Sequence, residues 1–108
     1  MNNKDIYSKI MEIKKQDAKR FACASIAVLY YELQNRLVDR KNWLNGEKTS
    51  KNFSPISESE IREMKERIKL CIKEKVQRFG ITQTDIDNYN QDCGNTMKIK
   101  ISYVSEIA

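Results

Sequence analysis

The sequence predicts a small, mainly α-helical bundle with one long or bent N-terminal helix, a second amphipathic helix, a short third helix and a C-terminal segment that has the pattern of a β-strand. Its 108 residues include only three Gly and one Pro, which favours helices over a turn-rich sandwich or barrel. The apolar content of 40% is too high for a disordered chain. This length accommodates one small domain, so residues 1–108 are predicted to form a single helical domain.

The first predicted helix runs from about Asn3 to Asn45, because apolar residues recur along it at helical spacing. Asp5 favours its positive end, and Gly46 closes it with a left-handed cap. Such a helix is roughly 60 Å long, whereas a compact domain of this size is roughly 35 Å across. It must bend near residues 17–20 or project beyond the body. Neither Gly nor Pro marks a break there, which favours a projecting helix that pairs with a second copy.

The middle of this helix, residues 21–31 with the sequence FACASIAVLYY, is apolar on every face. A helix of this kind has to be buried all round, and a monomer of two or three helices leaves one face in water. We therefore expect a homodimer formed through the first helix, or a protein partner at that place. Tyr30 and Tyr31 are expected to carry their hydroxyl groups to the partner. The alternative is a core helix that the rest of its own chain covers.

The second predicted helix follows a polar loop at residues 47–56. Ser57 is its N-cap and Glu60 completes a capping box. Gly80 ends it with a left-handed residue. Its apolar residues form a narrow stripe that is typical of a helical bundle: Ile61, Met64, Ile68, Cys71, Ile72, Val76 and Phe79.

The third predicted helix begins at the N-cap Thr82, with Asp85 completing another capping box, and ends near Asp92. The remaining residues, 95–108, form a strand-like tail. Apolar and polar residues alternate over residues 97–104, which predicts a strand that needs a partner for its backbone. Helical spacing of the apolar residues in this segment also fits, so strand and helix both stay open.

Residues 76–89, with the sequence VQRFGITQTDIDNY, resemble the turn and second helix of a helix-turn-helix. The residues that carry the resemblance are Phe79, Gly80, Ile81, Ile86 and Tyr89. It implies a DNA-binding regulator with a degenerate motif at residues 73–90, whose candidate base-reading side chains are Gln83, Thr84 and Asn88. Asp85 and Asp87 lie on the same face and would be pushed towards phosphates, whereas DNA binding depends on basic contacts. A plain corner between two helices is the alternative interpretation.

The positive charge is concentrated in the first half of the chain, where residues 1–54 carry a net charge of +5. Arg36, Arg40 and Trp43 fall on one stripe of the first helix, and Lys15 and Lys19 fall on another. Arginine beside an indole can hold a phosphate and a base or anchor a protein interface. We take these five as candidate partner-binding residues. Alternatively, Trp43 covers the end of the bundle while the charges stay solvated.

Few residues point to catalysis, a cofactor or a metal ion. The chain has no His, the commonest general base and metal ligand, and it lacks a Gly-rich phosphate loop. Its three Cys fit neither a disulfide framework nor a zinc site, and Cys23 and Cys71 are expected to be buried free thiols. The longest uncharged run has 11 residues, too few to cross a membrane. These observations predict a cytoplasmic protein that is not an enzyme.

The resulting hypothesis is a small non-catalytic binding protein that acts by occluding a protein partner. Its charge fits an inhibitor, from a phage or mobile element, of a host enzyme that handles nucleic acid. Lys, Ile and Asn make up 36 of the 108 residues, a bias common in AT-rich genomes of bacteria and phages. A DNA-binding regulator that contacts nucleic acid directly is the second hypothesis. The third is a structural assembly protein whose tail strand joins a neighbouring sheet.

Overall fold

The computed structural model describes residues 3–46 and 54–102, which form three α-helices in a mainly α bundle, as predicted. Helix α1 spans Asn3–Leu44, α2 spans Glu58–Phe79 and α3 spans Gln83–Cys93. Of the predicted polar loop at 47–56, residues 54–56 are described and have no regular secondary structure.

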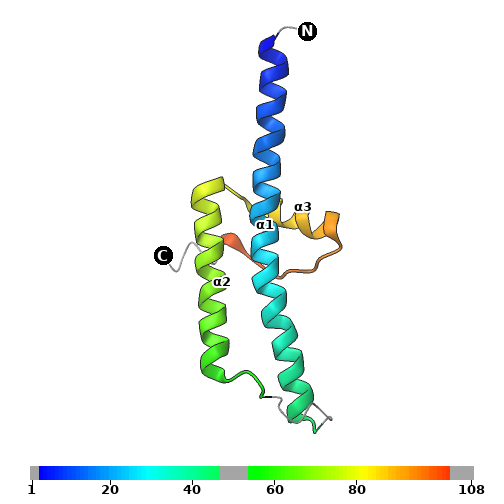
Figure 1. Ribbon diagram of the computed structural model, residues 1–108, viewed down its shortest axis with the longest axis vertical. Helices are drawn as coiled ribbons and strands as arrows, with labels where there is room; N and C mark the ends of the chain where they lie inside the picture. The colour runs from blue at the N-terminus through cyan, green and yellow to red at the C-terminus, as the bar shows by residue number, and fades with distance from the viewer. Residues whose placement is uncertain (1–2, 47–53, 103–108) are drawn as a thin grey trace.

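Helix α1 is continuous over 42 residues and does not break at residues 17–20. Figure 1 shows its N-terminal half extending alone beyond the body that α2 and α3 form around its C-terminal half. The molecule is accordingly elongated, with principal extents of 66 × 29 × 20 Å. Gly46, with φ of +78°, follows the helix in the left-handed region, as predicted. The expected projecting helix is therefore confirmed.

Helices α2 and α3 begin at the predicted N-caps, and α2 ends at the predicted Gly80. The Glu60 N–H donates to Ser57 Oγ at 3.1 Å, and the Asp85 N–H donates to Thr82 Oγ1 at 3.3 Å. Gly80, with φ of +65°, ends α2 in a conformation that side chains with a Cβ rarely adopt. Local chemistry therefore places the corner between α2 and α3.

The core lies where one face of α1 meets both α2 and α3, while α2 and α3 contact each other far less. Ile26 of α1 and Ile86 of α3 are fully buried at its centre. The other buried residues come from all three helices and from the segments beside them: Ala22, Cys23, Ala27, Leu33, Ile56, Met64, Ile68, Ile72, Ile81, Met97 and Ile99. Since α1 supplies the surface on which the other two helices rest, it organises the fold.

Within the described residues the C-terminal segment forms no strand; residues 95–100 are irregular, and residues 101–102 begin a helical turn. The alternation that predicted a strand is nevertheless seen in the burial. Met97 and Ile99 are buried, whereas Lys98 and Lys100 are exposed. Residues 103–104 of the predicted strand lie outside the described residues. The expectation that this segment needs a partner strand is not met, because side chains bind its backbone instead.

Candidate interaction surface

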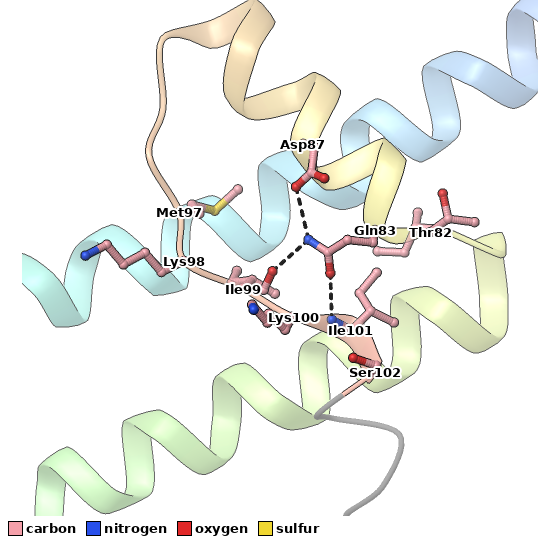
Figure 2. Close-up of a pocket in the computed structure, with 10 residues that line it drawn as sticks. Thr82, Gln83, Asp87, Met97, Lys98, Ile99, Lys100, Ile101 and Ser102 are labelled. Atoms are coloured by element: carbon pink, nitrogen blue, oxygen red, sulfur yellow. Dashed lines mark hydrogen bonds between the residues drawn. The ribbon is translucent and has the colours of Figure 1, made fainter.

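The backbone of the C-terminal segment is held by Gln83 in the first turn of α3. Figure 2 shows the Gln83 amide between the segment and its own helix. Its Nε2 donates to the Ile99 carbonyl at 2.8 Å and to Asp87 Oδ1 at 3.0 Å, and its Oε1 accepts from the Ile101 N–H at 2.9 Å. All polar atoms of this amide are engaged within the chain, so a role for Gln83 in reading DNA bases would require these bonds to break.

Three further side chains complete the attachment of this segment. Asn90 of α3 donates to the Met97 carbonyl at 3.0 Å and accepts from the Met97 N–H at 3.2 Å. The Tyr31 hydroxyl accepts from the Thr96 N–H at 2.8 Å, and the Tyr30 hydroxyl accepts from the Lys98 N–H at 3.3 Å. The two tyrosine rings meet edge to face, with centroids 5.2 Å apart. Both hydroxyls, predicted to face a partner, therefore face the chain itself.

Arg36 and Arg40 connect α1 to the start of α2. Arg40 donates to the Ile56 carbonyl at 2.6 Å and lies 3.9 Å from a Glu58 carboxylate oxygen. Arg36 lies 4.0 Å from a Glu60 carboxylate oxygen and also contacts the sulfur of Met64 at 3.7 Å. These bonds give the two guanidinium groups a structural role. Reversing their charge is therefore expected to lower the free energy of unfolding.

The other candidate binding residues lie apart from one another. Trp43 is partly exposed at the end of α1, Lys15 is exposed on the projecting half of that helix, and Lys19 lies 3.8 Å from Asp85 of α3. Of the proposed base-reading residues besides Gln83, Thr84 and Asn88 are exposed on α3. The structure thus does not gather the predicted residues into one patch.

The helix-turn-helix resemblance is reproduced locally but not in the packing. Helix α2, Gly80 and α3 follow in the expected order. The two helices, however, rest mainly on α1 and little on each other. Lys75, at a position where the motif prefers an apolar contact, lies 5.6 Å from the centre of the Phe79 ring. The segment therefore has the form of a corner between two helices.

A row of apolar side chains on α1 faces away from α2 and α3. Phe21 and Val28 are 71% and 68% exposed although they belong to the apolar run, and Ile13 is 61% exposed. Ile6 and Ile10 continue the row towards the N-terminus. We call these five residues the outer stripe. The apolar run is thus divided between a face that the body covers and a face that it leaves in water.

The outer stripe follows one side of the helix because of its spacing. Ile6 and Val28 are 22 residues apart, which corresponds to six turns of about 3.67 residues. That value is close to the 3.6 of a straight α-helix, so the row does not wind round to another face. Asp17 and Ala24 occupy the intervening positions of the row. The spacing of apolar residues along a helix does not by itself say which face a neighbouring helix covers.

The thiol of Cys23 is buried beneath α3. Burial, with a smaller effect from the Asp85 carboxylate, raises the pKa of this thiol to about 11. Burial also raises the pKa of Cys71. This thiol is only half-buried, although the sequence predicted that it is buried. Both thiols therefore stay protonated near neutral pH, and the thiolate is the form that acts as a nucleophile.

This raised pKa predicts how stability changes in alkali. The folded chain keeps the Cys23 proton at pH values where the unfolded chain has lost it. The protonated thiol therefore makes its full contribution to the free energy of unfolding below about pH 9, and this contribution declines up to about pH 11. It amounts to about 2–3 kcal/mol at roughly 1.4 kcal/mol per unit of pKa. Unfolding in urea across this pH range should show the stability difference between wild type and Cys23→Ala shrinking by that amount. Parallel curves for the two proteins would contradict the assignment.

The described part of the chain holds neither a metal-binding cluster nor a membrane-spanning helix. No group of three or more His, Cys, Asp or Glu side chains there is placed to hold a metal ion. Among the helices in residues 3–46 and 54–102, none has the length and apolar character needed to cross a membrane.

The function of this protein is inferred from its own surface, on which the outer stripe and the attached C-terminal segment are the main features. Comparison with protein-family models, with curated proteins and with solved structures finds no match for this chain.

Proposed function

We propose that this chain is a non-catalytic binding protein that self-associates through the outer stripe of α1 and acts by occluding a protein partner. The observation that carries the proposal is the exposure of Phe21 and Val28 on the face of α1 opposite its buried residues. A row of large apolar side chains in water is typical of a surface that another protein covers. A second copy of the same helix offers a row with the same spacing.

The energy available from this surface is sufficient for a weak dimer when the cost of association is at its low end. Full burial of a side chain such as Ile, Val or Phe stabilises by roughly 1.5–3 kcal/mol, and each residue of the outer stripe is between 45% and 71% exposed. Covering the exposed part of these side chains stabilises the dimer by about 1 kcal/mol for each side chain, and each copy contributes five of them. Association costs roughly 4–15 kcal/mol. At the low end of this cost about 6 kcal/mol is left, which corresponds to a dissociation constant of some tens of micromolar.

Analytical ultracentrifugation tests self-association directly. We expect wild type to form dimers at protein concentrations up to about 100 μM. The variant Phe21→Glu with Val28→Glu should sediment as a monomer with unchanged helix content, because both positions are exposed in the single chain. Leu70→Glu is the control, since it places one such charge at a 58% exposed apolar residue of α2. A wild type that stays monomeric over the whole range would refute the proposal.

The hypothesis that the occluded partner handles nucleic acid rests on the net charge of +5 and stays a prediction. The DNA-binding regulator gains no support from the described residues, because the Gln83 amide is already bonded within the chain. The assembly protein with a strand-adding tail gains none either, because side chains already bind the described part of the tail. Occlusion by the helical body is the function that we favour.

A further inference from the structure

A groove of about 450 Å³ lies between α1, α2 and the C-terminal segment, on the side of α1 away from the outer stripe. Its floor is aliphatic. Leu33 comes from α1, Ile68 and Ile72 come from α2, and Ile99 comes from the segment. The volume is within the range of roughly 300–1,000 Å³ that is usual for ligand sites. The groove therefore has an apolar surface on which a ligand can bind, and it is open to solvent on one side.

Four lysines surround this floor: Lys65 and Lys69 on α2, and Lys98 and Lys100 on the segment. No carboxylate lines the groove. Within residues 3–46 and 54–102, none of the four ammonium groups forms an ion pair with Asp or Glu. A site with an apolar floor and positive walls is complementary to a ligand that is apolar in the middle and acidic at its edges.

The lysines form two rows of similar pitch. Lys65 and Lys69 are one helical turn apart, about 6 Å along α2. Lys98 and Lys100 lie on either side of Ile99 in the C-terminal segment, where two residues span at most about 7 Å. Acidic residues four apart on a bound helix repeat at the same distance of about 6 Å. Two rows of glutamates flanking a leucine face would meet both walls at once.

The wall formed by the segment is held in place before any ligand arrives. Figure 2 shows Lys98 and Lys100 on the segment, where it passes between α1 and α2. The Tyr30 hydroxyl fixes the Lys98 N–H, and Gln83 bonds the backbone on both sides of Lys100, at Ile99 and Ile101. Because these bonds fix the backbone, only the lysine side chains have to be ordered on binding.

We infer that this groove binds an acidic amphipathic helix of a partner protein, with aliphatic side chains on the floor and carboxylates against the four lysines. A single-stranded nucleic acid would also meet the charge, but its bases stack on aromatic platforms. The aromatic residue that lines this groove, Tyr30, is already engaged, since its ring packs edge to face on Tyr31 and its hydroxyl accepts from the Lys98 N–H. A fatty acid has one carboxylate for four ammonium groups and an acyl chain that an open groove leaves in water. An acidic amphipathic helix can contact the aliphatic floor and pair with the lysines of both walls.

Fluorescence anisotropy with a defined probe tests this inference. The probe is a fluorescein-labelled helical peptide that carries leucines on one face and glutamates on both sides of them. We expect wild type to bind it at low salt. Lys65→Glu with Lys98→Glu, which reverses one charge in each row, should weaken binding at least tenfold, since it turns attraction into repulsion at both walls. A peptide with lysines in place of the glutamates should not bind.

Lys9→Glu with Lys41→Glu is the control, because it changes the net charge equally at exposed positions of α1 that do not line the groove. Binding by this variant should stay within about twofold of wild type. Equal loss in both double variants, or no binding by wild type, would overturn the inference. So would tighter binding of a single-stranded oligonucleotide that competes with the peptide. The groove and the outer stripe are on opposite sides of α1, so this result is independent of whether the chain self-associates.

Discussion

Replacing Ile26 with alanine is expected to lower the free energy of unfolding by about 2–5 kcal/mol. Ile26 is completely buried on the face of α1 that contacts α2 and α3. Truncation there removes methyl and methylene groups from a packed site and leaves a cavity that neighbouring helices fill only in part. Small domains are stable by roughly 5–15 kcal/mol, so this single change removes a large share of the total.

Urea unfolding followed by far-ultraviolet circular dichroism measures this loss. Leu70→Ala is the matched control because it removes the same number of carbon atoms from a residue that is 58% exposed on α2. Its effect is expected to stay within about 0.5 kcal/mol. Similar losses for the two variants would show that Ile26 does not lie at the centre of the core.

Replacing Gln83 with leucine is expected to cost about 2–4 kcal/mol and to release the end of the C-terminal segment. The variant leaves the Ile99 carbonyl and the Ile101 N–H without their bonding partner. Each unsatisfied group that stays away from water costs about 1–3 kcal/mol. If the segment instead moves out into solvent, the burial of Ile99 is lost, which has a similar cost.

Amide hydrogen exchange separates this effect from general destabilisation. The Ile101 amide should exchange faster in Gln83→Leu at conditions where the chain stays folded, whereas the Met97 amide, which Asn90 binds, should keep more of its protection. Gln91→Leu is the control, because Gln91 is an exposed glutamine on the same helix. Unchanged exchange at Ile101 would mean that the Gln83 amide does not hold the segment.

The three helices and their ends were predictable because their signals are local. Ser57 with Glu60 and Thr82 with Asp85 mark the starts of α2 and α3 within four residues each, and Gly80 marks the corner. Capping depends on neighbouring residues only, so it can be read without knowledge of the tertiary structure. The length of α1 was predictable for a similar reason, since no residue in it interrupts a helix.

The partners of the C-terminal segment were not predictable in this way. Alternation correctly indicated that Met97 and Ile99 are buried, although the described residues form no strand there. The groups that bind this backbone, however, are amides and hydroxyls from α3 and α1, up to 68 residues away in the chain. A glutamine in the first turn of a helix has no local feature that distinguishes a bond to distant backbone from exposure to water.

The candidate surfaces show the same limit. Arg36 and Arg40 looked like binding residues because arginine beside tryptophan is common in interfaces, yet the start of α2 brings Ile56 and Glu60 to them. The outer stripe and the lysine groove depend on which face of α1 the body covers. That choice is made by packing among segments far apart in the sequence, which spacing along one helix does not encode.

The unsupported half of α1 has a consequence for how this chain acquires its helical structure. An isolated helix of some 15 residues is marginal in water, because starting a helix is costly whereas extending one is not. The body supplies the starting turns, and the helix propagates from there past Asp17 towards Asn3. The ordering of Ile6 and Ile10 is thereby coupled to the folding of α2 and α3. Any change that unfolds the body also unfolds the N-terminal part of the outer stripe, even when the residues of the stripe are unchanged.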